Sequence, residues 1–398
     1  MAIALALLAI VATACALPAA TAPPVATPDA AWQPETPTPT PAAQPRATMP
    51  AMQGPLAQVL FERGSELWGL CLPANERQPV VQGLQGASSF GVGDPWALAP
   101  NGRYLALARN GDGQVTLALA ALPGGQLQEV GRYAGRIEAL RWSHDSTRVA
   151  CVVNRRDVRT GDLQEASLHL YDVVGWRDTV PYRQAFEGPD TVRQELWLEG
   201  WVPGDQALYV AIAGDRTADA GMLYALNARG GEPRLVSADY ALKGGQAVSA
   251  ASARVLLRAR AARGRAAPLF VAGVAPDGSL SDIQPLSPDD WTVGAVAWSP
   301  DGQQVAAERL ETQAHGTYAV HLWLLAPDGA EPRQLTGDPI FREEQPVWTP
   351  DGQAIVFGRW RTERPEPAGL WTLHLPAAEL ELLDESGLRA QAVAGEGR

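Results

Sequence analysis

Lysine, cysteine and histidine are scarce in this 398-residue sequence, with only three Cys and five His. The single lysine, Lys243, leaves arginine to supply the rest of the 32 basic residues, which we read as a codon-composition habit. The formal net charge of −12 excludes a typical nucleic-acid-binding protein, because phosphate neutralisation needs clustered Lys and Arg. The chain is nevertheless long enough to bury a core without disulfide or metal staples.

Long apolar runs are also absent, apart from the thirteen residues Ala2–Ala14. A membrane-spanning helix needs about 20 apolar residues, so this run fits the h-region of a signal peptide over residues 1–14. Ala12-Thr13-Ala14-Cys15 resembles a bacterial lipobox, although position 12 is usually Leu and no basic residue precedes the run. The resemblance implies lipidation of Cys15, with ordinary secretion or a retained anchor as alternatives.

Residues 15–50 form a segment that cannot build a packed core. Ten of the 33 prolines lie between Ala16 and Pro50, together with ten Ala and six Thr. Such a composition favours polyproline II and disorder. We interpret it as a linker that carries a folded domain, residues 51–398, away from a membrane.

The folded part repeats a turn motif. Trp298-Ser-Pro-Asp-Gly302 and Trp348-Thr-Pro-Asp-Gly352 are near copies, with weaker copies starting at 98, 142, 201 and 248. Pro presets φ, Asp hydrogen-bonds the turn backbone and Gly accepts positive φ, so each copy predicts a tight turn between two strands. The turn residues that we single out as structural are Trp142, Asp145, Trp298, Asp301, Gly302, Trp348, Asp351 and Gly352.

Each copy is followed by short apolar runs separated by turn residues, which is typical of antiparallel β-structure. One unit of about 45 residues cannot bury both its faces, whereas a closed ring of units can. The pattern resembles the WD-type propeller repeats of TolB and of prolyl-oligopeptidase-type enzymes. The resemblance implies an all-β propeller of four-stranded antiparallel blades.

Six motifs predict six blades, and an upstream segment predicts a seventh. Gln58–Arg63 and Leu67–Leu72 read as the second and third strands of a blade that lacks its own turn motif. We expect Leu388–Ala394 to supply its missing strand and close the ring. A six-bladed ring with an accessory hairpin is the alternative.

Motifs for chemistry are missing. The sequence has no G-x-S-x-G, H-E-x-x-H or C-x-x-C, and we predict no catalytic, metal or cofactor site. His169, His321 and His374 occupy equivalent strands, which we attribute to repeat drift. Cys71 and Cys151 are expected to be buried thiols in different blades, with a disulfide as the alternative.

One basic stretch stands out from the acidic composition. Its arginines are a candidate anion-binding patch: Arg254, Arg258, Arg260, Arg263 and Arg265. A solvated strand and hairpin loop is the alternative interpretation.

For function, we expect a monomeric, lipid-anchored envelope scaffold that binds a protein or peptide partner. The alternative is a secreted enzyme that cleaves glycans or esters at the channel mouth. Three or more polar groups converging there would favour the enzyme, whereas an apolar, wet or charge-poor mouth would favour binding.

Overall fold

The computed structural model describes residues 59–71, 76–82, 95–110, 113–122, 126–157, 159–186, 194–214, 221–244, 246–259, 266–312, 318–362 and 366–392. The predicted signal peptide (1–14), Cys15 and the linker (15–50) lie outside these residues. The described part is all-β, with 29 strands in seven antiparallel sheets and no helix. We call each sheet a blade and number the blades in chain order.

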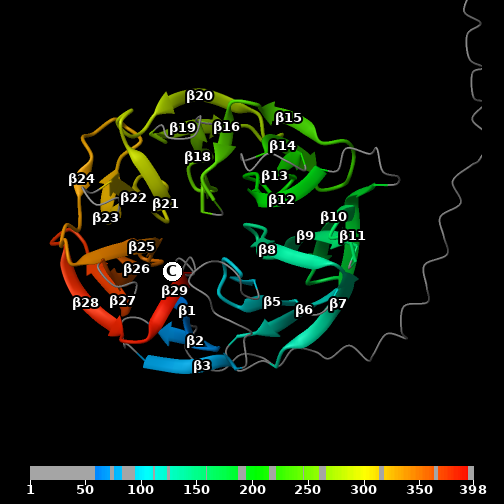
Figure 1. Cartoon of the computed structure of the whole chain (residues 1–398), viewed down its shortest axis with the longest axis horizontal. Helices are drawn as coiled ribbons and strands as arrows, with labels where there is room; N and C mark the ends of the chain where they lie inside the picture. The colour runs from blue at the N-terminus through cyan, green and yellow to red at the C-terminus, as the bar shows by residue number, and fades with distance from the viewer. Residues whose placement is uncertain are drawn as a thin grey trace, which may run out of the picture. The chain divides into compact units, whose positions relative to one another are not determined.

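The blades follow one another around a ring (Figure 1). Blades 1 to 4 contain β1 (Val59–Arg63), β2 (Glu66–Cys71), β3 (Glu76–Gln82); β4 (Trp96–Leu98), β5 (Tyr104–Asn110), β6 (Gln114–Ala121), β7 (Gln128–Ala134); β8 (Arg136–Trp142), β9 (Arg148–Arg156), β10 (Leu163–Asp172), β11 (Arg177–Ala185); and β12 (Gln194–Trp201), β13 (Ala207–Gly214), β14 (Met222–Asn227), β15 (Arg234–Ser237). Blades 5 to 7 contain β16 (Tyr240–Leu242), β17 (Val248–Ser249), β18 (Arg254–Ala259), β19 (Leu269–Val274), β20 (Leu280–Pro285); β21 (Thr292–Trp298), β22 (Val305–Thr312), β23 (Tyr318–Leu325), β24 (Arg333–Gln334); and β25 (Phe341–Trp348), β26 (Ala354–Arg361), β27 (Pro367–His374), β28 (Glu379–Asp384).

The last strand, β29 (Gly387–Ala392), completes blade 1. It pairs antiparallel with β1, so that Val59 faces Ala392 and Phe61 faces Ala390. The C-terminal strand therefore lies beside the first strand of the ring (Figure 1). This confirms both the seven-bladed prediction and the expected closing segment.

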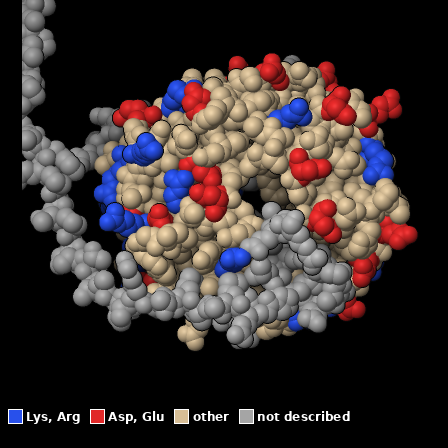
Figure 2. All heavy atoms as spheres, turned by 180° about the vertical axis from the view of Figure 1, so that it is seen from behind, with Lys and Arg blue, Asp and Glu red and all other residues tan. Residues whose placement is uncertain are grey.

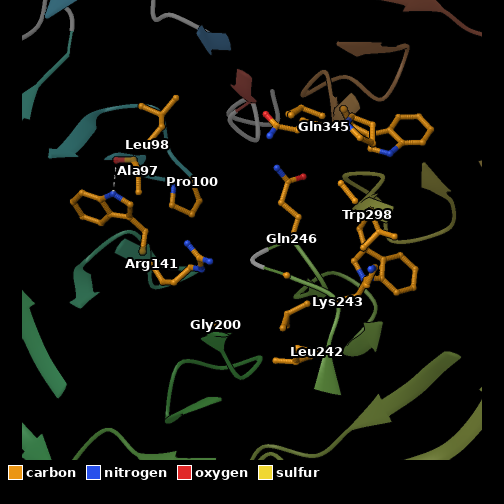
Figure 3. Close-up of a pocket in the computed structure, with 18 of the residues that line it drawn as sticks. Ala97, Leu98, Pro100, Arg141, Gly200, Leu242, Lys243, Gln246, Trp298 and Gln345 are labelled. Carbon is orange, nitrogen blue, oxygen red and sulfur yellow. Dashed lines mark hydrogen bonds between the residues drawn. The ribbon is translucent and has the colours of Figure 1, made fainter. Parts of the chain in front are cut away.

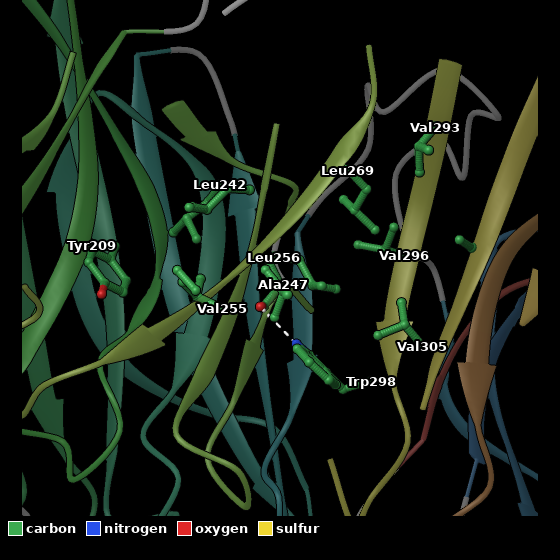
Figure 4. Close-up of a cluster of buried hydrophobic side chains, with 14 of the residues drawn as sticks. Tyr209, Leu242, Ala247, Val255, Leu256, Leu269, Val293, Val296, Trp298 and Val305 are labelled. Atoms are coloured by element: carbon green, nitrogen blue, oxygen red, sulfur yellow. Dashed lines mark hydrogen bonds between the residues drawn. The ribbon is translucent and has the colours of Figure 1, made fainter. Parts of the chain in front are cut away.

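The core consists of apolar layers between neighbouring blades. In the largest cluster Tyr209 of blade 4, Val255 of blade 5 and Val305 of blade 6 are all fully buried (Figure 4). Burial of both faces of each sheet explains why the apolar runs of the second and third strands are nearly continuous.

The repeat turns have the predicted conformation. The fifth motif position takes a left-handed backbone in five repeats, with φ of 69° at Gly102, 60° at Ser146, 57° at Asp205, 68° at Gly302 and 69° at Gly352. Glycine is the natural residue at such a position, and Ser146 and Asp205 show that other residues adopt it when the surrounding contacts compensate.

Candidate functional site

A cavity of about 900 Å³ runs through the centre of the ring. Strands from every blade contribute to its wall: β4, β8, β12, β16, β17, β18, β21, β25 and β29. From behind, the molecule is hollowed near its middle, with acidic and basic side chains spread over the surrounding face (Figure 2). The cavity is the point at which all seven repeats converge, and it is our candidate site.

Irregularities in the inner strands shape the wall. The pairing of β12 with β13 shifts register between Leu198 and Gly200, and that of β25 with β26 shifts between Glu344 and Val347. Glu199 and Gln345 occupy these bulges and line the cavity. A β-bulge re-aims side chains, and here two polar residues are directed to the channel.

Blade 5 carries the largest irregularity. Its inner strand is broken between β16 and β17, and both pieces pair with β18. The break contains Lys243 and Gln246, which line the cavity, and Arg258 of the second strand lines it as well. Figure 3 shows Lys243 and Gln246 on one side of the space and Arg141 on another.

Arg141 is held by backbone carbonyls. Its guanidinium donates to the carbonyl oxygens of Glu199, at 3.2 Å, and Leu140, at 3.0 Å. Burial lowers the pKa of this guanidinium, while the Glu199 carboxylate opposes the shift. Burial likewise raises the pKa of Glu199, against the charges of Arg141 and Arg258.

Lys243 is another charged residue of the wall, and Glu308 lies behind the wall and interacts with it. Burial, and then the charge of Arg258, lower the pKa of Lys243 to about 8, although Glu308 attracts its ammonium. Glu308 accepts backbone N–H bonds from Gln345, at 2.6 Å, and Ala295, at 2.8 Å, and burial raises its pKa. Glu308 thus holds the irregular inner strands of blades 6 and 7, where Gln345 has a φ of 58°.

The predicted turn residues have structural roles. Ser299 Oγ donates to Asp301 at 2.6 Å, and Thr349 Oγ1 donates to Asp351 at 2.7 Å. The Ser299 hydroxyl and the Gln303 N–H hold the pKa of Asp301 below its ordinary range. Asp145 accepts the equivalent bond from Ser143 at 2.6 Å.

The repeat tryptophans are buried at the ends of inner strands, where each indole N–H reaches the preceding blade. Trp298 Nε1 donates to the Ala247 carbonyl at 2.9 Å (Figure 4). Trp142 and Trp348 make equivalent bonds to Ala97, at 2.9 Å, and Ala297, at 3.0 Å.

Two arginines of the predicted patch, Arg254 and Arg258, lie among the described residues, both in β18. Arg254 begins β18 and is exposed, whereas Arg258 lines the channel ~13 Å further along the strand. Arg260, Arg263 and Arg265 lie outside the described residues. Anion binding by the whole stretch therefore stays a prediction.

Three histidines lie in the third strands of their blades, as predicted, and each has an acidic partner. His321 Nδ1 lies 3.0 Å from Glu343 Oε2, and His374 Nε2 lies 3.1 Å from Glu381 Oε2. No group of His, Cys, Asp and Glu suited to a metal ion occurs in the part of the chain that the structure describes.

His169 belongs to a buried cluster that the sequence did not reveal. Ser167 Oγ lies 3.1 Å from its Nε2, and Asp178 Oδ2 lies 3.0 Å from its Nδ1. This is the order of groups in a nucleophilic triad, but Ser167 is only 2% exposed between blades 2 and 3. A substrate has no access to that hydroxyl, so we assign the cluster to inter-blade packing.

Cys151 is a free, buried thiol in β9, as predicted. Burial, and next the Asp178 charge, raise the pKa of this thiol, which keeps it unreactive. Cys71 ends β2, and Cys15 lies outside the described residues. Among the described residues there is also no helix long and apolar enough to cross a membrane.

Neither a protein-family model nor a curated protein matches the chain. Solved structures do match. A prolyl endopeptidase is 12% identical, with a TM-score of 0.60 over 86% of this chain and 50% of its own. An oligogalacturonate lyase from Vibrio parahaemolyticus is also 12% identical, with a TM-score of 0.56 over 79% of this chain and 84% of its own.

A putative TolB from Agrobacterium tumefaciens is 14% identical, with a TM-score of 0.42 over 66% of this chain and 86% of its own. The chain spans about half the length of the first matched peptidases, an acylaminoacyl peptidase and the prolyl endopeptidase. At these identities the matches to the prolyl endopeptidase and the oligogalacturonate lyase show a shared β-propeller fold, and a fold of this kind hosts many unrelated functions.

Proposed function

We propose that this chain is a TolB-like binding module of the cell envelope whose ligand or protein partner engages the central channel. The observation that carries the proposal is the convergence of all seven blades on one cavity of about 900 Å³, in a chain whose sequence has no G-x-S-x-G, H-E-x-x-H or C-x-x-C motif. The lipobox-like Cys15 and the Pro-rich linker 15–50 support attachment to a membrane, with the propeller as the exposed, monomeric head.

The test uses a substitution, Gly200→Trp, that narrows the channel and leaves its charged residues in place. Gly200 lines the cavity, and a Cβ added to it would lie 3.7 Å from the nearest atom, Val248 Cγ2, which is ordinary contact. Gly175 is a matched control in the β10–β11 turn, where an added Cβ would lie 3.5 Å from Asp172 Oδ1. Neither glycine has a positive φ, so both positions accept a Cβ atom without backbone strain.

The experiment captures components of detergent-solubilised envelope on three full-length proteins: the wild type, Gly200→Trp and Gly175→Trp. The melting temperature of each protein confirms that it is folded. The wild type and Gly175→Trp should retain the same specific component, and Gly200→Trp should lose it. Equal retention by Gly200→Trp would place the binding surface elsewhere. If no protein retained a specific component, the proposed binding function would fail.

An enzyme is the second candidate. The channel holds more than three converging polar groups, which is the feature that favours catalysis. Glu199 has a raised pKa and Lys243 a lowered one, so two titratable groups of the wall are shifted toward neutrality. Turnover of a glycan or ester by the wild type that is lost in both Glu199→Gln and Lys243→Gln would support this candidate.

A further inference from the structure

Two cations in the channel, Lys243 and Arg258, form no hydrogen bond or close ion pair with a described carboxylate, although Glu308 and Glu199 attract them at longer range. No acidic or carbonyl oxygen of the described chain is hydrogen-bonded to Lys243 Nζ or to the Arg258 guanidinium, and no ion pair within 4.0 Å joins them to a described carboxylate. Both residues are half-buried and line the same cavity. Both cations therefore lie at the cavity wall without a hydrogen-bonded counter-ion among the described residues.

The other cations of the wall are already engaged. Arg141 donates to two carbonyl oxygens, as described above. Arg389 lies 3.4 Å from Glu62, which also accepts the Trp96 indole N–H at 2.7 Å. These contacts position Arg141 and Arg389, while Lys243 and Arg258 remain available.

The nearby carboxylates do not neutralise the pair fully. Glu199 is attracted to both Arg141 and Arg258, and Glu308, which attracts Lys243, is already bound by two backbone N–H groups. Among the described residues that line the cavity, the charged side chains are four cations and one carboxylate: Arg141, Lys243, Arg258, Arg389 and Glu199. The wall therefore carries excess positive charge inside a protein whose net charge is −12.

Placing two like charges together inside a protein is unfavourable unless something supplies opposite charge. The break in the inner strand of blade 5 places Lys243 at the wall, directly after the pair Leu242–Leu257, while Arg258 lies opposite Ala241 in the paired part of β16. The same break brings Gln246 to the wall, and Gln345 faces it from blade 7 (Figure 3).

We propose that the central channel binds a small, multiply charged anion, with Lys243 and Arg258 as its charge contacts. This inference rests on the proposed function and names the class of ligand. The cavity of about 900 Å³ accommodates a ligand larger than a single acid group. The Gln246 and Gln345 amides provide donors and acceptors for its neutral polar groups.

Carboxylate and phosphate groups share the chemistry that this pair recognises. An ammonium and a guanidinium donate charge-assisted hydrogen bonds to either kind of oxygen, and a guanidinium does so through two parallel bonds. The experiment therefore compares two probes, citrate for polycarboxylates and pyrophosphate for phosphates. Sucrose serves as the neutral probe.

Binding of each probe to the full-length protein is measured by isothermal titration calorimetry at pH 7 and two ionic strengths. At least one anion should bind with 1:1 stoichiometry, more weakly at high salt, and sucrose should not. Arg258→Gln and Lys243→Gln should each weaken binding about 10- to 100-fold, the loss expected for one charge-assisted hydrogen bond. Arg254→Gln, on the same strand but outside the channel, should leave affinity unchanged.

The Arg254 control separates the channel from the surface patch that the sequence suggests. Equal losses in Arg254→Gln and Arg258→Gln would overturn the channel site in favour of that patch. Failure of both anions to bind the folded wild type would overturn the proposal outright. In that case loss of an envelope component by Gly200→Trp alone would still support the proposed function, so the two failures are distinguishable.

Lysine chemistry provides a second readout. Lys243 is the only lysine, so acetylation by an amine-directed ester can be assigned to it by peptide mass mapping, apart from the amino terminus. The bound anion should slow acetylation of Lys243 at least several-fold in the wild type. Unchanged acetylation under saturating anion would contradict contact with Lys243 even if a binding isotherm were observed.

Discussion

The indole Nε1 of Trp348 donates a hydrogen bond to the carbonyl oxygen of Ala297, 3.0 Å away in the preceding blade. Ala297 immediately precedes Trp298, the equivalent tryptophan of its own repeat. Trp142, Trp201 and Trp298 make the same bond to the residue before the preceding turn motif. The repeat tryptophan therefore joins consecutive blades as well as filling the space between them.

Replacing this indole should destabilise the ring. Trp348→Phe keeps an aromatic ring but leaves the buried Ala297 carbonyl without its donor, so we expect a loss of about 1–3 kcal/mol in unfolding free energy. Trp197→Phe is the control, because that side chain is 42% exposed and its indole N–H has no bond to a described residue. Denaturant unfolding measures both, and equal stability of the two variants would show that the inter-blade bond contributes nothing.

Replacing His144 by proline, the residue found at this position in the clearest repeats, should destabilise the protein. Proline is the common residue at this turn position, but the His144 N–H donates to buried Asp205 Oδ1 at 3.0 Å. The turn matches that of Trp298–Gly302, with Ser146 N bonded to Ser143 O as Gly302 N is to Ser299 O, so proline fits sterically. We expect His144→Pro to be about 1–2 kcal/mol less stable than His144→Ala, which keeps the N–H. A higher melting temperature for His144→Pro would refute this.

The closing strand should be needed for a cooperative fold. A chain ending at Glu385 lacks β29 and leaves β1 as an open sheet edge. We expect it to lose the cooperative thermal transition, whereas a chain ending at Ala392 keeps all of β29 and should melt like the full chain. Matching melting curves for the two truncations would contradict closure of the ring by this strand.

Lys243 should titrate near neutrality. Burial and Arg258 lower its pKa to about 8, while Glu308 opposes the shift and Arg141 and Glu199 complete the charged surroundings. The rate of acetylation should therefore rise to half its plateau near pH 8, and Arg258→Gln should move this midpoint to higher pH by removing a neighbouring positive charge. Because the unfolded chain keeps this proton to higher pH, Lys243 should also add stability as pH rises above 8. If the pH midpoint of acetylation were the same in Arg258→Gln as in the wild type, the charge of Arg258 would not affect Lys243.

Lipidation is tested separately from the fold. Cells expressing the full chain should incorporate a fatty-acid analogue, and Cys15→Ser should abolish incorporation while Cys151→Ser, at a buried thiol, should not. Label retained in Cys15→Ser would exclude Cys15 as the lipid site.

Local sequence patterns were enough to predict the fold class. The motif of Trp298–Gly302 and its copies predicted the turns, and the segment after 388 predicted the closing strand, because turn chemistry and strand periodicity are local properties. They also explained Asp145, Asp301 and Asp351 as turn residues, which their hydrogen bonds confirm.

The position of the candidate site depends on the closed ring. Arg141, Glu199, Lys243 and Arg258 come from three blades and meet because the ring closes, so no spacing along the chain reveals them. Two local features of the sequence lie at the broken inner strand of blade 5: the weak motif copy that starts at 248 and the single lysine, Lys243. No other local feature pointed to the site. Because the ring closes, the irregular inner strand of blade 5 faces residues of other blades across one cavity. The fold could therefore be predicted from local sequence patterns, whereas the site could not.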